Sequence, residues 1–406
     1  MISNVSSGEV SFEHTRYVTP EYFAALSDDR KPTAGDLLFT VTGSYGIPIR
    51  IETNREFCFQ RHIALLKFSI ANTDYLKNAL ASPFVTKQCD DVATGTAQKT
   101  IPLSGLRKLL MPVPPANEQR LILGKIEELM PKVDEYEKAA QQLTEFEARF
   151  PADLKKAILQ SAVEGKLVPQ DPKDEPASIL VERIAEERKA LVKVGKLKRD
   201  KHESAIFRGS DRLTYEARDG ETVCIEDELP FKIPESWAWV RLNSLGTFVG
   251  GHTPSLADHT NWDNGNVIWI TSKDMKSKYI VDSGEKLSAK GAKELQLLPP
   301  ETILMVTRSG ILKHTFPVAI AKTHLTINQD QRALRLHCPD MSEFVYVLLR
   351  GLEGRILRDF VKKGTTVQSI LWDKFINMPI PLPPLAEQLR IVAEVERLEA
   401  QVAQLQ

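Results

Sequence analysis

The feature that most constrains this chain is an internal repeat. Residues 95–119 read GTAQKTIPLSGLRKLLMPVPPANEQ and residues 364–388 read GTTVQSILWDKFINMPIPLPPLAEQ, and the two segments align without a gap when one is shifted by 269 positions. The same shift places FQRHIAL (59–65) opposite NQDQRAL (328–334). Because similarity at a fixed offset is the signature of a duplicated structural unit, the sequence predicts two related folded units.

Each copy of the repeat continues into apolar residues that are spaced alternately by four and three positions. This spacing is typical of the a/d seam of a paired helix. The seams consist of Ile122, Ile126, Leu129 and Val133 after the first copy, and of Ile391, Val395, Leu398 and Val402 after the second. We predict a helix of about 50 Å over residues 117–150, with Pro131 as a candidate kink. We expect the two seams to pair with each other; helices over 152–164 and 177–192, or the unit that each helix follows, are the alternative partners.

The predicted fold class is α+β, with short strands and helices in both units. The runs WAWVRL, NVIWIT, TILMVT and FPVAIA are broken by Gly, Pro and Asn and precede the helical stretch SEFVYVLLRGLEGRILRDF. The first copy shows the later elements and has no counterpart of residues 229–268. We therefore expect four parts: a front-truncated first unit (1–115), a helical region and linker (116–228), a second unit (229–384) and the start of a distal helix (385–406).

The charge of the chain is uneven, although 53 Lys and Arg almost balance 54 Asp and Glu. Basic residues outnumber acidic ones by 19 to 14 over 229–384, and the reverse holds by 10 to 15 over 116–186. The four cysteines show no metal-ligand spacing, which disfavours a zinc site and a disulfide scaffold and predicts a reducing, cytoplasmic location. The N-terminus does not resemble a signal peptide, and no run of 18 apolar residues predicts a membrane span.

Common catalytic motifs are missing from the sequence. It contains no P-loop, no HExxH and no GxSxG, and the stretch GTFVGG (246–251) lacks the spacing of a dinucleotide-binding loop. We therefore predict a chain without catalytic residues, metal or cofactor of its own. Two alternatives stay open: a stand-alone DNA methyltransferase or nuclease with an unrecognised motif, and a coiled-coil adaptor without a role on DNA.

Basic residues gather with hydroxyl and amide side chains in turns that contain glycine, a mixture that suits contacts with phosphates and bases. In the second unit the candidate DNA-binding residues are Lys273, Lys276, Lys278, Tyr279, Arg308, Ser309, Lys313, Lys362, Lys363, Thr365, Thr366 and Gln368. In the first unit they are Arg61, His62, Thr96, Gln98 and Lys99. Ordinary solvated turn chemistry explains any single one of them equally well. Different side chains at repeated positions nevertheless predict two units that read different DNA sequences.

The repeated joints MPVPPANEQ and IPLPPLAEQ, together with IPESWAWVRLNSL (233–245), IWITSKDM (268–275) and LKKAILQSAVEGKLVPQ (154–170), give the chain a family resemblance. It resembles the DNA-specificity subunit of type I restriction-modification systems. The resemblance implies two target recognition domains that each read half of a split site on double-stranded DNA. It also implies paired helices that set their spacing and dock two methyltransferase subunits, through which restriction subunits join. S-adenosylmethionine, ATP and Mg²⁺ would belong to these partners. The chain departs from the family in the front of its first recognition domain and in its short distal helix.

Overall fold

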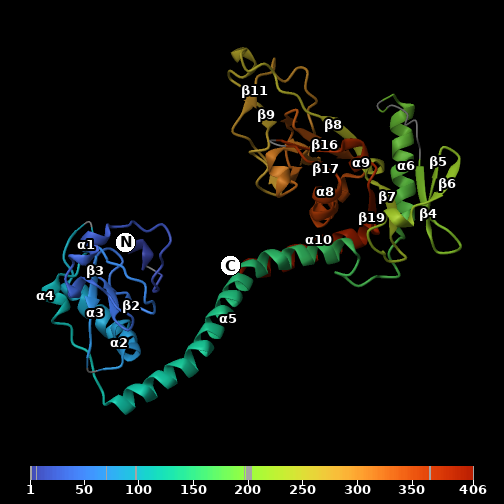
Figure 1. Ribbon diagram of the computed structural model, residues 1–406. Coiled ribbons are helices and arrows are strands. Elements are labelled where there is room, and N and C mark those ends of the chain that lie inside the picture. Colours follow the sequence, from blue (N-terminus) through green and yellow to red (C-terminus); the bar gives the residue numbers. More distant parts are fainter. Residues whose placement is uncertain are drawn as a thin grey trace. The chain divides into compact units, whose positions relative to one another are not determined.

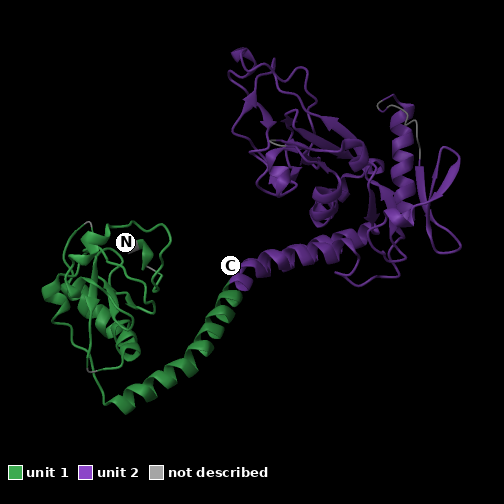
Figure 2. Ribbon diagram, in the orientation of Figure 1, with its two compact units in different colours: residues 1–144 green, residues 145–406 purple. Residues whose placement is uncertain are grey.

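The computed structural model describes residues 2–5, 7–69, 71–96, 98–195, 197, 204–364 and 367–405 (Figure 1). The chain divides into two compact units, residues 1–144 and residues 145–406 (Figure 2). Each unit combines short strands with helices, so the predicted α+β class is confirmed.

Unit 1 is built on a three-stranded antiparallel sheet. Its elements are the strands β1 (Leu37–Thr40), β2 (Pro48–Arg50) and β3 (Ile63–Leu66), in the order β2-β1-β3, and the helices α1 (Pro20–Ala24), α2 (Thr73–Leu80), α3 (Pro83–Val92) and α4 (Leu103–Leu106), with short 3₁₀ turns at Ile2–Asn4 and Asp28–Arg30. Leu37 and Phe39 of the central strand β1 pack in one core cluster with residues of α2 and α3, whereas Leu38 faces a second cluster. All four residues of β1 are therefore buried.

Unit 2 contains a five-stranded central sheet with the strand order β10-β14-β12-β16-β8. These strands are β8 (Gly246–Gly250), β10 (Tyr279–Ile280), β12 (Ile303–Val306), β14 (Val318–Ala321) and β16 (Gln331–Leu336). Smaller sheets are formed by β4 (Ser204–Arg208), β5 (Thr214–Arg218) and β6 (Glu221–Cys224), by β9 (Val267–Ile270), β11 (Lys286–Leu287) and β15 (Thr326–Ile327), by β13 (Arg308–Ser309), β17 (Val361–Lys362) and β18 (Gln368–Ile370), and by β7 (Ala238–Arg241) and β19 (Pro379–Leu382).

Helices cover one face of the central sheet of unit 2. The helices of the unit are α6 (Ala177–Lys193), α7 (Ser342–Gly351), α8 (Glu353–Asp359), α9 (Trp372–Ile376), α10 (Leu385–Ala403) and the last part of α5 (Ala116–Val163); short 3₁₀ turns lie at Glu226–Glu228, Leu242–Leu245, His259–Asn261, Gly310–Lys313 and Pro339–Met341. Ile303 and Met305 of β12 share a core cluster with α7, α10 and the end of α5, while Leu304 and Val306 face a second cluster that includes β9 and β15. The alternation along β12 therefore buries both faces of the sheet.

The helix α5 is longer than predicted. We expected it to end near Phe150, before Pro151, but it continues to Val163. The correction has a physical reason: Ile158, Leu159, Ala162 and Val163 are buried in the core of unit 2, and tertiary packing of this kind outweighs the loss of one backbone hydrogen bond at a proline.

The structure confirms the repeat at both proline-rich joints. The helices that follow the joints begin at Ala116 and Leu385, which are equivalent positions. The Gln119 side chain donates a hydrogen bond from Nε2 to the Pro114 carbonyl (2.7 Å), and Gln388 donates in the same way to the Pro383 carbonyl (2.9 Å). The buried amide of each joint therefore fixes the turn that leads into its helix.

One strand of the repeat is paired in unit 2 only. The segment β19 pairs with β7 along its whole length and is fully buried. In unit 1 no strand is assigned to the equivalent residues 110–113, and Leu110 and Val113 are 71% and 53% exposed. The difference follows from the sequence, because β7 lies in the segment that has no counterpart in the first copy.

Within the described ranges, no helix is both long and apolar enough to cross a membrane. Over the same ranges, no three His, Cys, Asp or Glu side chains converge as a metal site. The GTFVGG stretch has a packing explanation: a Cβ atom at Gly251 would lie 1.9 Å from the Asn328 carbonyl oxygen, so only glycine allows this close approach of two backbones.

Candidate nucleic-acid interface

The small sheet β13-β18-β17 brings two predicted DNA-binding residues together. Ser369 of the middle strand lies opposite Arg308 on one side and opposite Lys362 on the other. Residues directly opposite each other in an antiparallel sheet point to the same face, with Cβ atoms about 5 Å apart. Arg308, Ser369 and Lys362 therefore form a row, here called the cation row, whose two positive residues are about 10 Å apart.

Both charges of the cation row are available to an external anion. The Arg308 side chain is 65% exposed, and its nearest carboxylate is Asp330, with Nε and Oδ1 4.0 Å apart. Lys362 is exposed and forms no ion pair within the described part of the chain. Exposed cations with such weak internal pairing can bind a phosphate with little loss of existing contacts.

Two neighbours of the cation row have other tasks in this structure. The Gln368 side chain is buried, and its Nε2 donates to the Gly364 carbonyl (2.9 Å). The Ser309 hydroxyl accepts a hydrogen bond from the Ile311 amide (3.3 Å) at the start of a 3₁₀ turn. Both side chains therefore hold turns in place, and direct base contacts by them stay a prediction.

Equivalent positions of the repeat carry a glycine, Gly364 after β17 and Gly95 in unit 1, that lies close to a backbone carbonyl oxygen. A Cβ atom at Gly364 would lie 2.4 Å from the Val367 carbonyl oxygen. In unit 1, Gly95 has φ +106°, and its Cβ atom would lie 2.5 Å from the Gln98 carbonyl oxygen. Only glycine fits this tight turn. The predicted Thr365 and Thr366 lie outside the described residues.

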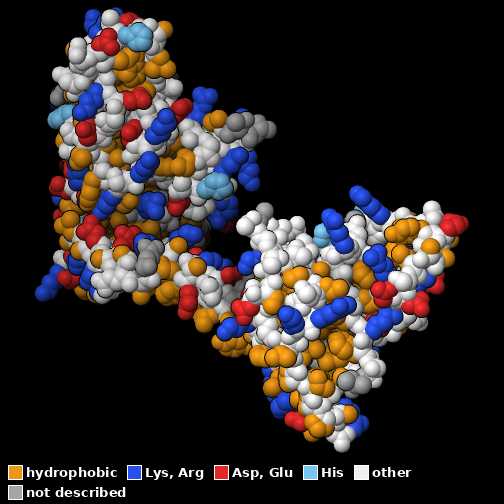
Figure 3. Space-filling view, turned by 90° about the vertical axis from the view of Figure 1, so that its left-hand side faces the viewer, with side chains coloured by type: hydrophobic (Ala, Val, Ile, Leu, Met, Phe, Trp, Pro, Cys, Tyr) orange, Lys and Arg blue, Asp and Glu red, His pale blue; other side chains and the backbone are white. Residues whose placement is uncertain are grey.

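Four other predicted lysines are exposed in turns. Lys273 and Lys276 follow strand β9, Lys313 ends the 3₁₀ turn after β13, and Lys363 follows β17. The face drawn in Figure 3 shows basic side chains dispersed among acidic and apolar ones. On this face the basic side chains therefore form no single broad patch.

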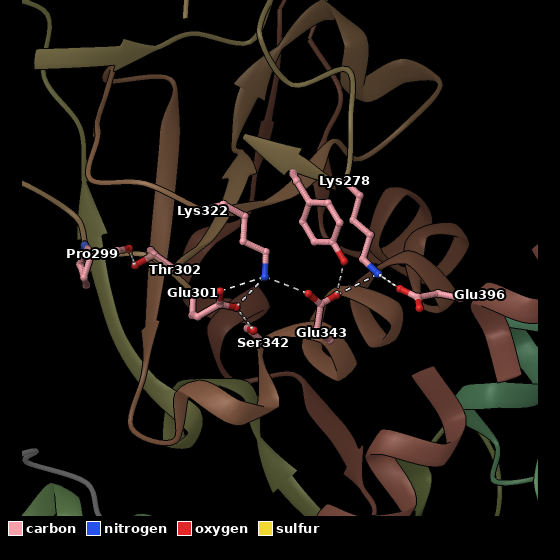
Figure 4. Close-up of polar contacts among 9 residues, drawn as sticks. Lys278, Pro299, Glu301, Thr302, Lys322, Ser342, Glu343 and Glu396 are labelled. Carbon is pink, nitrogen blue, oxygen red and sulfur yellow. Dashed lines mark hydrogen bonds and ion pairs between the residues drawn. The ribbon is translucent and has the colours of Figure 1, made fainter. Parts of the chain in front are cut away.

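Lys278 and Tyr279 belong to an internal ionic network (Figure 4). The Lys278 ammonium is 2.8 Å from Glu343 of α7 and 2.6 Å from Glu396 of α10. Burial acts to lower the pKa of Lys278, but hydrogen bonds to the two glutamates outweigh it and raise the pKa. The Tyr279 hydroxyl donates to Glu343 (3.2 Å). Their contacts with DNA stay a prediction, but the network already compensates the charge of Lys278.

The same network fixes the edge of the central sheet to the helices. Lys322, which follows β14, lies 2.8 Å from Glu301 and 3.0 Å from Glu343, and Ser342 donates to Glu301 (2.5 Å). Glu343 thus receives bonds from both lysines, which lower its pKa against the opposing effect of burial. The network joins sheet, α7 and α10 within unit 2.

In unit 1 the predicted residues meet around the end of β1. Val41, directly after β1, donates its N–H to the His62 carbonyl (3.0 Å), and its own carbonyl accepts from Ile101 (2.8 Å). Gly43 donates to the Lys99 carbonyl (3.1 Å). The turn with Arg61 and His62 and the loop with Thr96, Gln98 and Lys99 therefore flank one strand end. Arg61, Thr96, Gln98 and Lys99 are exposed, and His62 is half-buried.

Unit 2 repeats this arrangement at the end of β12. The Thr307 amide donates to the Asp330 carbonyl (2.9 Å), and the Thr307 carbonyl accepts from Ile370 (2.8 Å). The chain then continues into Arg308. The two units thus present equivalent loops at equivalent strand ends, with different side chains on them.

The two predicted seams differ in burial. Ile391, Val395 and Val402 are buried in the core of unit 2, against which Leu398 also packs. In the first seam Ile122 packs on the core of unit 1 and Ile126 is half-buried, whereas Leu129 and Val133 are 41% and 51% exposed. The second seam therefore has apolar partners in its own unit, which was one of the alternatives, and the pairing of the two seams stays a prediction.

Sequence reasoning missed a buried polar joint at the start of α10. Glu387 is fully buried, and its carboxylate accepts from Gln170 Nε2 (2.5 Å) and from the Trp237 indole N–H (3.0 Å). Burial raises the pKa of Glu387, while these two hydrogen bonds act to lower it. The repeat-equivalent Glu118 is exposed. The signal available in the sequence was the pair of prolines before an acidic residue, but its partners are 150 and 217 positions away.

Residues 234–406 match a protein family described as the type I restriction modification DNA specificity domain. This range contains the cation row, the central sheet of unit 2 and α10. The matched range thus includes the second copy of the repeat together with β7, a strand that has no counterpart among the described residues of unit 1.

Curated relatives extend the similarity beyond the specificity domain and confirm the resemblance drawn from the sequence. The chain is 34% identical over 164 residues to the specificity subunit of the type I restriction enzyme EcoR124I/EcoR124II of Escherichia coli, covering 40% of each protein. It is 28% identical over 384 residues to the EcoEI specificity subunit of the same organism, covering 82% of this chain and 61% of that one. The chain thus spans about two fifths to three fifths of these relatives. Among solved structures, the HsdS subunit from Thermoanaerobacter tengcongensis aligns with a TM-score of 0.43 and 18% identity, over 94% of this chain and 78% of that chain.

Proposed function

We propose that this chain is the DNA-reading specificity subunit of a type I restriction-modification complex and that its second recognition domain meets DNA at the cation row. The observation that carries the proposal is the placement of Arg308 and Lys362 on one face of a sheet inside the specificity domain. A lysine suits a backbone phosphate as a point charge, and an arginine can bind a guanine edge with two hydrogen bonds.

The proposal assigns the other half of the DNA site to unit 1. Its reading residues would be those on the two loops that flank the end of β1, namely Arg61, His62, Thr96, Gln98 and Lys99. Equivalent strand ends with different side chains support this division, because each unit would present the same backbone framework to a different base sequence.

The proposed partners follow from the type of complex. They are double-stranded DNA, two methyltransferase subunits and the restriction subunits, and the catalytic groups with S-adenosylmethionine, ATP and Mg²⁺ would reside in those subunits. In this proposal the chain contributes sequence recognition and spacing and no chemical step.

DNA binding by the cation row can be tested with the variants Arg308→Ala and Lys362→Ala of the full chain, assembled with its methyltransferase subunits. Lys362→Ala should weaken binding to every sequence and lower the slope of log affinity against log salt by about one. Arg308→Ala should reduce affinity for the specific site by about 1–3 kcal/mol and relax a single base position. Lys290→Ala is the matched control, because this exposed lysine lies outside the cation row and already pairs with Asp258 (2.9 Å).

The same measurements separate the alternatives. Unchanged affinity and slope in both cation-row variants would show that another surface meets the DNA. A complex that binds no DNA at low salt would favour the coiled-coil adaptor. Methyl transfer from labelled S-adenosylmethionine by this chain alone would favour the stand-alone methyltransferase.

A further inference from the structure

A basic cavity lies in unit 2 where the end of α5 meets the junction of α7 and α8. Its volume is about 590 Å³, and four of its lining residues are Lys156 of α5, Arg350 of α7, and Arg355 and Arg358 of α8. His314, directly after the 3₁₀ turn that follows β13, also lines it. Three helices thus direct four lysine and arginine residues to one concave surface.

The two carboxylates that line the cavity already have partners. Glu353 Oε1 accepts from the Thr315 hydroxyl (2.6 Å) and from the Phe316 amide (2.7 Å). The other carboxylate, Glu164, accepts from Gln160 and from Lys166, both at 2.5 Å. The cations of the cavity therefore outnumber its carboxylates, and only Glu353 also lies near one of these cations, with its Oε1 4.0 Å from Arg350 Nη1.

The cations, in contrast, have donors to spare. Lys156 is exposed and forms no ion pair among the described residues. Arg355 donates from Nη2 to the Glu228 carbonyl (2.8 Å), and its Nε lies 3.9 Å from Asp359, but its Nη1 is buried without any acceptor. Burial lowers the pKa of Arg355, as expected for a guanidinium that lacks full compensation. The ion pair of Arg358 with the adjacent Asp359 is largely exposed and therefore weak. A buried donor without an acceptor is costly, and the residue that carries it is one of those that line the cavity.

The cavity is close in the chain to the cation row. Helix α8 ends at Asp359 and β17 begins at Val361, so that Arg358 lies only four residues before Lys362 of the row. On the other side, the turn that begins after Ser309 leads directly to His314. A duplex that lies on the cation row would therefore bring part of its backbone toward this cavity.

We infer that this cavity binds a backbone phosphate of the DNA that the second recognition domain reads. The inference rests on the proposed function and extends it, because it adds a site that holds the backbone without reading bases. Arginine is suited to this task, since its planar guanidinium can bind a phosphate with two parallel hydrogen bonds.

The test uses the full chain with its methyltransferase subunits and a random-sequence duplex, with binding followed by fluorescence anisotropy over a range of salt. Lys156→Gln and Arg358→Gln should each weaken binding several-fold to all sequences and lower the salt slope by about one, leaving the ratio of specific to non-specific affinity unchanged. Lys155→Gln, on the same helix but outside the cavity, should bind as the wild type does. Wild-type affinity and slope in both cavity variants would overturn the inference.

Ethylation interference identifies the anion. Ethylation of one backbone phosphate near the half-site should impair DNA binding by the wild type. DNA binding by Lys156→Gln should not change when the same phosphate is ethylated. If Lys156→Gln bound DNA normally but no longer assembled with the methyltransferase, the cavity would hold acidic side chains of a partner and the inference would be wrong. If Lys362→Ala loses DNA binding and Lys156→Gln binds normally, phosphate binding in the cavity is refuted and the cation row is not. If Lys362→Ala binds DNA normally, the role of the cation row is refuted.

Discussion

Glu387 offers a sharp test of how the start of α10 is fixed to the rest of unit 2. Glu387→Ala would leave one buried donor, the Trp237 indole N–H, without its acceptor, and would also remove the acceptor of the exposed Gln170 side chain. The lost acceptor of the buried indole costs about 1–3 kcal/mol, and the removal of a buried carboxylate offsets part of this cost. We expect the free energy of local opening at the start of α10 to fall by about 1–2 kcal/mol. Glu387→Gln keeps an acceptor of similar shape and should change it by less than about 1 kcal/mol.

The pH dependence of this joint has a defined sign. The pKa of Glu387 is raised above its ordinary value of 4.5, mainly because the carboxyl group is buried. The folded state therefore binds this proton more tightly than the unfolded state. Its contribution to stability is fully present below pH 4.5 and is lost as the pH rises through the raised pKa. Wild type should consequently lose stability relative to Glu387→Gln as the pH is increased over this range.

Hydrogen–deuterium exchange of the amides in the first turns of α10, corrected for the intrinsic rate at each pH, measures both effects. The matched control is Glu118→Ala, which removes the repeat-equivalent but exposed carboxylate at the start of α5 and should change local stability by about 0.5 kcal/mol. A difference between wild type and Glu387→Gln that stays constant with pH would refute the reasoning, as would equal effects of Glu387→Ala and Glu118→Ala.

Three further predictions concern the core and the helices. Arg241→Met should destabilise unit 2 by about 3–5 kcal/mol in urea unfolding, because it leaves the 8%-exposed carboxylate of Glu216 without its counter-charge. Leu398→Asp should destabilise the isolated chain by several kcal/mol, whereas Leu129→Asp should leave its melting unchanged and impair assembly only if the two seams pair; normal assembly of Leu129→Asp would exclude that pairing. Four residues inserted after Ala139 should lengthen the spacer of the methylated site without changing either half-site. Sequencing of methylated DNA measures both, and an altered base in a half-site would contradict the prediction.

The repeat made much of the fold predictable, because the same elements could be recognised at equivalent positions of two copies in one sequence. It predicted the helices after both joints and the shared loops, and the structure places the buried Gln119 and Gln388 identically. It did not predict that the expected helices over 117–150 and 152–164 form one continuous helix, α5. The reason is that the burial of Ile158 and Val163 depends on residues more than 100 positions later in the chain.

The candidate site was only partly predictable for a similar reason. Residue type suggested both Arg308 and Lys278, but strand register decides that Arg308 faces outward beside Lys362, while two glutamates from distant helices engage Lys278. Sequence also treated Glu118 and Glu387 alike. Only the presence of Trp237 in one unit makes one of them a buried acceptor.

The prolines of β19 limit this strand to a single hydrogen-bonded partner strand, β7. The Leu242 amide donates to the Met378 carbonyl, so the hydrogen-bonded pairs with β7 fall at Met378, Ile380 and Leu382. Pro379 and Pro381 occupy the alternate positions, whose amide nitrogens face away from β7, and neither can donate a hydrogen bond there. The outer edge of β19 is therefore unable to template another strand, a protection against edge-to-edge aggregation. In unit 1 only Pro381 has a proline at the equivalent position, Pro112; Leu110 replaces Pro379, and its amide donates to Gln88 Oε1 (2.9 Å) and is therefore also unavailable to a neighbouring strand.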